Sequence, residues 1–212
     1  MKNSLFLFLF HKHSLRYLAY TFAFALLFTI LDLELFALVA FAFMLLAAYA
    51  FRNPPKIVQN FETDALLSPV DGKVVSVEEI EDAAFGYKVV VASSYRDVSL
   101  LRAPMKASVL DVSVHRGTRL AKGSKLFYDL NENGSITFED EAGHSIKIEH
   151  RLTRSFAPLY IDVVKYETVE KGTPYGVMLS GETTIYLPKS FKLNVNAAAQ
   201  LSASETLLGY FL

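Results

Sequence analysis

Two long apolar runs dominate the N-terminal quarter of the chain. Residues 17–31 carry no charge, a short acidic turn follows at 32–34, and residues 35–51 are again uncharged. Each run is close to the roughly 20 residues that span a bilayer as a helix, and each can be extended slightly. A pair of buried helices in a soluble protein would show a polar stripe, which neither run has. The pattern therefore predicts a transmembrane helical hairpin with helices at about 15–31 and 35–51.

Basic residues flank this hairpin on both sides: Lys2, Lys12, Arg16, Arg52 and Lys56. Positive flanks tend to stay on the cytoplasmic side, whereas the connecting turn is acidic. Two consecutive prolines at 54 and 55 end the second helix. We therefore expect a membrane hairpin at 1–56 in the cell (inner) membrane and a cytoplasmic domain at 57–212.

The remainder of the chain is rich in short segments of β-branched and aromatic residues. Turn signals such as Asp71-Gly72, Asn133-Gly134 and Lys171-Gly172 separate them. The predicted strands are 74–77, 87–92, 109–114, 135–139, 145–149, 160–166, 183–187 and 191–195. No long amphipathic helix is evident after residue 57. The fold class is therefore mainly β, with a sandwich or a barrel-like roll following the hairpin.

One pattern occurs twice in this β domain. Residues 68–77 (SPVDGKVVSV) and 103–112 (APMKASVLDV) share small-Pro-apolar-x-small-x-Val-apolar-x-Val. This resembles the hammerhead half-repeat of biotinyl and lipoyl carrier domains, and it predicts two half-units that pack face to face around one core. Chance similarity between short valine-rich strands is the alternative. Lys106 in the second copy suggests a carrier lysine, but carrier domains do not place the modified lysine at the start of a half-repeat.

Composition removes several classes of function. The chain has 21 basic and 22 acidic side chains, so no basic excess favours nucleic acid. It has no cysteine, which excludes disulfide scaffolds, zinc ribbons and thiol catalysis. The five histidines do not form a metal-ligand spacing, and no metal site is predicted. Phosphate-loop, zinc-protease and serine-hydrolase motifs are all missing.

Five short motifs follow one another along the chain, and their order indicates a family more specifically than any single motif does. After the apolar hairpin come Phe-Arg-Asn-Pro (51–54), Ser-Pro-Val-Asp-Gly (68–72), Asp-Val-Ser-Leu-Leu-Arg-Ala-Pro (97–104), Asn-Glu-Asn (131–133) and Tyr-Leu-Pro (186–188). Together they resemble the short, membrane-anchored form of the phosphatidylserine decarboxylase family, over nearly the whole chain. That family shows Phe-Arg-Asp-Pro, Ser-Pro-Ala-Asp-Gly, Asp-Val-His-x-x-Arg-Ala-Pro, Asn-Glu-Arg-Asn and a Gly-Ser pair shortly before Tyr-Leu-Pro.

The resemblance implies a specific chemistry. The family's proenzyme cuts itself between the Gly and the Ser, and the Ser becomes a pyruvoyl group that forms a Schiff base with the amine of phosphatidylserine. An Asp and a His assist self-cleavage, and Asp71 occupies the position of that Asp. Arg102, and also Arg52, are candidates for phosphate contact through bidentate hydrogen bonds. A membrane phospholipid is the implied partner, and the sequence leaves the oligomeric state open.

The chain departs from the family pattern at two catalytic positions. Ser99 stands where the family has its histidine, and Ser180-Gly181 stands where the family has Gly-Ser. A glycine has no β-oxygen to lose, so a pyruvoyl group would have to come from Ser180. Two functions therefore stay open: a decarboxylase with Ser180 as its processed residue, or a noncatalytic homologue that binds lipid or acts as a membrane scaffold. The first would need a base, and His115 or His150 could supply it if the fold brings either close.

Overall fold

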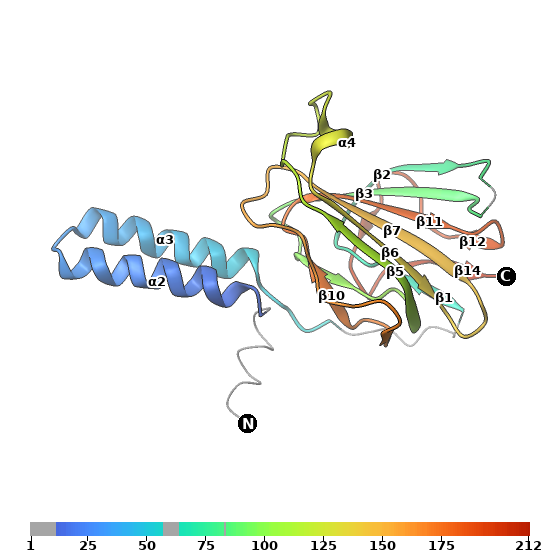
Figure 1. Cartoon of the computed structure of the whole chain (residues 1–212), viewed down its shortest axis with the longest axis horizontal. Coiled ribbons are helices and arrows are strands. Elements are labelled where there is room, and N and C mark those ends of the chain that lie inside the picture. Colours follow the sequence, from blue (N-terminus) through green and yellow to red (C-terminus); the bar gives the residue numbers. More distant parts are fainter. Residues whose placement is uncertain (1–11, 57–63, 83) are drawn as a thin grey trace. The chain divides into compact units, whose positions relative to one another are not determined.

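The structure, a computed structural model, describes residues 12–56, 64–82 and 84–212. The chain divides into two compact units, residues 1–55 and 56–212 (Figure 1). In the described residues, the first unit is helical and the second is built from strands with one short helix. Each unit is considered by itself below.

The helical unit contains α2 (Ser14–Ile30) and α3 (Glu34–Ala50), each of 17 residues. Asp32 has a left-handed backbone (φ 52°), which ends α2 and separates the two helices. At 1.5 Å per residue each helix is about 25 Å long, against about 30 Å of bilayer hydrocarbon. Within the described residues, neither these helices nor any other is long and apolar enough to cross a membrane. The predicted transmembrane hairpin is therefore wrong, because each of its helices has only 17 residues.

The β unit is antiparallel throughout its three sheets. Its elements are β1 (Ala65–Leu67), β2 (Gly72–Glu79), β3 (Tyr87–Ser93), β4 (Leu100–Arg102), β5 (Ala107–His115), α4 (Phe127–Leu130), β6 (Asn133–Glu139), β7 (Ser145–Leu152), β8 (Tyr160–Ile161), β9 (Thr168–Val169), β10 (Pro174–Val177), β11 (Gly181–Leu187), β12 (Phe191–Leu193), β13 (Gln200–Leu201) and β14 (Leu207–Phe211). Eight strands form one sheet in the order β13-β2-β3-β11-β7-β6-β5-β9. The orders β1-β14-β12 and β4-β10-β8 describe the two smaller sheets.

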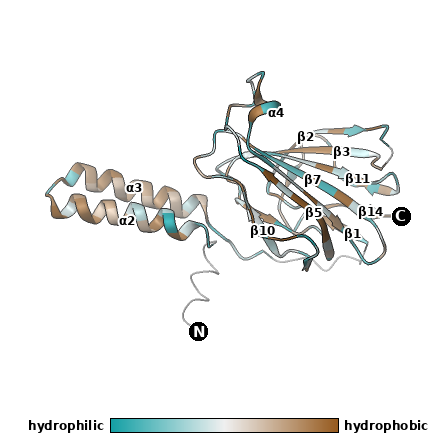
Figure 2. Ribbon diagram, in the orientation of Figure 1, coloured by the Kyte–Doolittle hydropathy of each residue, from teal (hydrophilic) through white to brown (hydrophobic). Residues whose placement is uncertain are grey.

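Alternation along the strands decides which face of the large sheet is buried. In β7, Ile146, Ile148, His150 and Leu152 are buried, and the residues between them are only partly covered. Teal and brown segments accordingly mix along the strands of this unit (Figure 2). The buried face joins side chains of both small sheets in one core, so these sheets cover the large sheet on that face.

The predicted half-repeat corresponds to a real internal symmetry. β2 and β5 begin at Gly72 and Ala107, which are equivalent positions of the two copies. Both strands shift register at the same repeat position, after Val74 in β2 and after Val109 in β5. The strand order is also palindromic, since β13-β2-β3-β11 on one side matches β9-β5-β6-β7 on the other.

Reciprocal hydrogen bonds join the starts of the two copies. Leu67 N–H donates to Pro104 O (3.0 Å), and Arg102 N–H donates to Pro69 O (2.9 Å). The halves do not pack face to face as separate layers, however. They lie edge to edge in one sheet, where β11 pairs with β7 along its length. This corrects the predicted packing of the half-units, because the strand ladder continues across the symmetry axis.

Candidate active site

Asp71 immediately precedes β2, and its carboxylate is fully engaged. Oδ1 accepts a hydrogen bond from Ala203 N–H at 2.7 Å, and Lys56 Nζ lies 3.3 Å from both carboxylate oxygens. The Asp71 side chain is 14% exposed and that of Lys56 9%. The ion pair and the hydrogen bond together anchor the turn that carries Ala203.

Lys56 has more than one anionic partner. Its Nζ also donates to Ser202 Oγ at 2.5 Å and lies 3.1 Å from Glu205 Oε2. One ammonium thus bridges two carboxylates and the Ser202 hydroxyl. The cluster of Lys56, Asp71, Ser202 and Glu205, which we call the Lys56 cluster, is an anchoring network.

Ser93 connects Asp71 with Ser180. At the end of β3, Ser93 Oγ donates to Asp71 O at 2.6 Å, and Ser93 O accepts from Ser180 Oγ at 3.5 Å. Ser180 is 8% exposed and lies in the bend between β10 and β11. The structure thus brings two of the predicted site residues to one place, although a carbonyl oxygen is the hydroxyl's acceptor there.

Ser99 lies beside the same segment. Its carbonyl oxygen accepts a hydrogen bond from Met178 N–H at 2.8 Å, and the residue is buried. On the other side, Ser180 O accepts from Thr153 N–H at 3.1 Å. Residues 178–180 are therefore fixed from two sides, and the positions that sequence motifs connect with self-cleavage meet around them.

Comparison with known proteins agrees with this arrangement. A family model described as "Phosphatidylserine decarboxylase" matches residues 43–209. The chain belongs to the phosphatidylserine decarboxylase family. Its members use a pyruvoyl group to decarboxylate phosphatidylserine, a step of phospholipid biosynthesis.

Three curated relatives illustrate the similarity, and each is named "Phosphatidylserine decarboxylase proenzyme". The protein of Syntrophotalea carbinolica is 28% identical over 190 residues, which cover 87% of this chain and 88% of the relative. That of Burkholderia mallei (strain SAVP1) is 27% identical over 176 residues, covering 80% and 81%. That of Desulfotalea psychrophila is 25% identical over 183 residues, covering 82% and 85%. The similarity therefore extends over most of both chains in each case.

The sequence motifs assign Gly181 to the position of the family's serine, and in the structure a side chain does not fit there. Gly181 lies between Ser93 of β3 and Leu152 of β7 in the ladder. A Cβ at this position would be 2.4 Å from Arg151 O and 2.6 Å from Met178 Sδ. The methionine could move, but the backbone oxygen belongs to a paired strand. The residues at the family's register therefore do not fit a pyruvoyl group.

Neither histidine considered as a replacement for the family's base bonds to Ser180. His150 is completely buried, with Nδ1 2.9 Å from Thr183 Oγ1 and Nε2 2.8 Å from Tyr175 OH. Burial lowers the pKa of His150 to about 3, so the ring is neutral and both nitrogens are occupied. His115 is exposed at the end of β5, paired with Asn133 in the ladder.

Arg102 is placed in the interior. It is 8% exposed, and Nη1 donates to Gly172 O at 3.0 Å. Burial lowers the pKa of Arg102, while the charges of Asp71 and Glu205 oppose this shift. Its predicted contact with a lipid phosphate is not tested by these contacts, which give it a role in holding the turn at 170–173.

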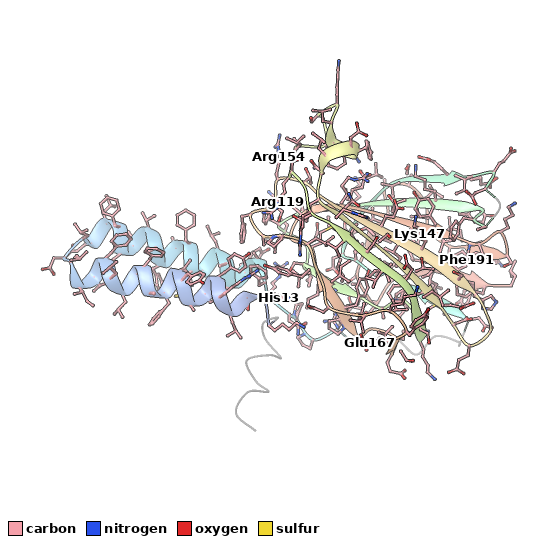
Figure 3. All side chains as sticks on the ribbon, in the orientation of Figure 1. His13, Arg119, Lys147, Arg154, Glu167 and Phe191 are labelled. Atoms are coloured by element: carbon pink, nitrogen blue, oxygen red, sulfur yellow. The ribbon has the colours of Figure 1, made fainter. Side chains whose placement is uncertain are left out.

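The Asn-Glu-Asn motif has a structural role in this chain. Asn131 Oδ1 accepts from Leu120 N–H (2.9 Å) and Thr118 Oγ1 (2.9 Å), and Nδ2 donates to Leu120 O (2.9 Å) and Leu152 O (2.8 Å). Glu132, 1% exposed, forms ion pairs with Arg116 and Arg119. Arg119 and Arg154 lie close together beside the α4 loop (Figure 3), and Arg154 N–H donates to Arg119 O. The motif thus fastens the loop at 116–130 to the sheet.

Lys106 is exposed and pairs with Glu141 at 2.7 Å. It lies just before β5, the position equivalent to Asp71 in the other half-repeat. Sequence reasoning did not identify Lys56, Ser93 or Ser202 as part of the site. No motif marks these three residues, because strand pairing and turn packing bring them to Asp71 from separate parts of the chain.

Proposed function

We propose that this chain is a phosphatidylserine-binding member of its family that remains uncut and forms no pyruvoyl group. The observation that carries this proposal is the lack of room for a β-carbon at Gly181, the residue that the sequence motifs assign to the serine position of the family. Without a β-oxygen at that position, the self-cleavage that the relatives' name "proenzyme" implies cannot proceed there.

Two further observations support the loss of processing. Sequence motifs assign Ser99 to the position of the family's histidine, so this position supplies no imidazole to the segment at 178–180 that it contacts. Asp71 is retained, but its carboxylate contacts Lys56 and Ala203 N–H, whereas the Ser180 hydroxyl donates to Ser93 O. Serine, aspartate and histidine act as a unit in such chemistry, and the loss of one member removes most of the activity.

Phosphatidylserine as the ligand is supported by family membership and by the names of the relatives. A second candidate function, phosphatidylserine decarboxylation by a pyruvoyl group made from Ser180, is favoured by one contact. The Ser180 hydroxyl is buried against Ser93, whose own hydroxyl binds the backbone of Asp71. A serine one residue before the usual register is therefore connected through Ser93 to the backbone of the retained aspartate.

Intact-protein mass spectrometry of the purified full chain distinguishes these two functions. We expect a single species of full mass, and the same result for Ser180→Ala. Two fragments, the smaller beginning at residue 180 with a blocked N-terminus, would overturn the proposal and establish the second candidate. Incubation at raised temperature before measurement ensures that slow cleavage is detected.

Vesicle co-sedimentation tests the ligand independently of cleavage. We expect more of the full chain to sediment with vesicles of phosphatidylserine and phosphatidylcholine than with vesicles of phosphatidylglycerol and phosphatidylcholine at equal negative charge. Equal binding to both would show that only surface charge is recognised. That result would refute phosphatidylserine as the ligand even if the chain is uncut.

A further inference from the structure

A polar pocket of about 190 Å³ lies on the face of the large sheet that is turned away from the core. Its walls come from β5, β6, β7 and β11, which are neighbours in the sheet. Ser113 and Ser135 contribute hydroxyls that lie 3.0 Å apart, and Arg151 contributes the cationic group. Ser180 and Asp71 do not line it.

Among the described residues, the charged side chains of the pocket form ion pairs except for Arg151. Glu149 pairs with Lys147 at 2.6 Å, and Glu182 forms an ion pair with Lys122. Each carboxylate thus has its own lysine. For Arg151, the described part of the chain provides no carboxylate within ion-pair distance, and its buried Nε–H has no hydrogen-bond partner there. A buried N–H without an acceptor is costly, and an anion would satisfy it.

The guanidinium is also held in place. Arg151 Cζ lies 5.1 Å from the ring centroid of Tyr128, on α4, and Tyr128 OH lies 3.3 Å from Glu182 Oε1. Stacking on an aromatic ring restricts the arginine while leaving its edge available for hydrogen bonding. The loop at 116–130, which Asn131 fastens to the sheet, therefore places Tyr128 against the guanidinium that β7 supplies to the pocket.

We propose that this pocket is a binding site for a phosphate group, with Arg151 as its principal ligand-binding residue. A phosphate has several acceptor oxygens, so it can accept from the guanidinium, from the hydroxyls of Ser113 and Ser135 and from the His115 ring at once. The volume suits a small phosphate or the phosphate end of a lipid head group. The site is independent of processing at residue 180, so it goes beyond the function proposed above.

Isothermal titration calorimetry of the full chain with inorganic phosphate, at constant ionic strength, tests this site. Since hydrogen bonds to charged groups are strong, we expect Arg151→Gln to weaken binding by about tenfold or more. Arg151→Lys should retain part of the affinity, and Ser135→Ala should lower it about threefold. Lys106→Gln is the matched control, because it removes one exposed positive charge elsewhere and should leave binding unchanged.

Two further titrants separate the sources of the phosphate. Tighter binding of glycerol 3-phosphate than of monomeric dihexanoyl-phosphatidylserine would identify a free phosphate ester, and the reverse order would identify a lipid head group. No binding of any titrant, or equal binding by wild type and Arg151→Gln, would overturn the proposal. If Arg151→Gln does not fold, the affinities of Arg151→Lys and Ser135→Ala provide the test. Unchanged phosphate affinity in both variants would also overturn the proposal.

Discussion

Lys56 Nζ lies 3.3 Å from both carboxylate oxygens of Asp71, in a position where both side chains are largely buried. Asp71 belongs to the motif that connects the chain with self-processing decarboxylases, yet here it is the centre of an ion-paired turn. The same carboxylate accepts from Ala203 N–H, and the same ammonium contacts Glu205. The retained aspartate therefore has a structural reason to persist that does not depend on catalysis.

Replacing Lys56 tests this anchoring role. Lys56→Gln leaves the carboxylates of Asp71 and Glu205 without their shared cation, and breaking a buried pair in this way costs about 3–5 kcal/mol of unfolding free energy. Urea denaturation of the full chain measures the loss. Lys88→Gln is the control, since its pair with Glu78 is exposed and should contribute below about 1 kcal/mol. Equal effects of the two substitutions would contradict the anchoring role.

The buried His150 predicts a loss of stability in mild acid. Burial lowers its folded pKa to about 3, whereas the unfolded chain takes up the proton near pH 6.5. Below pH 6.5 the unfolded state therefore binds more protons, and stability falls until the pH reaches the folded pKa. From pH 6.5 to pH 5 this residue alone should cost about 2 kcal/mol. Denaturant unfolding at both pH values, compared with His150→Asn, isolates the contribution, and an identical pH dependence in the variant would refute it.

Sequence periodicity locates the long strands well because one face of each strand is buried in the core and the other is partly exposed. Each of the eight predicted segments contains strand residues, and β7 alternates from Ser145 to Leu152 as its pattern indicates. Short strands such as β1, β4 and β13 are missed, since two or three residues carry no periodicity. The predicted helices at 15–31 and 35–51 lie within one residue of α2 and α3, but neither helix is long and apolar enough to cross a membrane.

Motifs identify part of the candidate site but not its chemistry. Asp71, Ser99 and Ser180 come from three distant segments, and the fold brings these segments together through Ser93 and Met178. The partners of Asp71 and the lack of space at Gly181 could not be predicted, because both depend on atoms of other strands and turns. Local sequence gives the residue type, and strand pairing decides what that residue contacts.

Restoring the serine of the family at position 181 should damage the fold instead of reviving cleavage. Gly181→Ser brings a Cβ within 2.4 Å of Arg151 O, and overpacking against a paired strand costs about 1–3 kcal/mol. Gly123→Ser is the matched control, because nothing lies within 4 Å of a Cβ there. Thermal unfolding and denaturing gels of both variants give the result. A Gly181→Ser chain that is as stable as wild type and cleaves itself would show that the site is only one substitution from activity.

Asn131 should be among the most stabilising polar residues of the β unit. Its amide makes four hydrogen bonds that connect residues 118–120 and Leu152, and Asn131→Ala leaves Leu120 N–H and two carbonyl oxygens without these partners. We expect a loss of about 2–4 kcal/mol in unfolding free energy, and faster amide hydrogen exchange in the loop at 116–130. Asn133→Ala serves as the comparison, because its side chain donates a single bond, to Asn131 O at 3.0 Å. If both variants lost the same stability, or if exchange in the loop stayed unchanged in Asn131→Ala, the motif would not be what fastens this loop to the sheet.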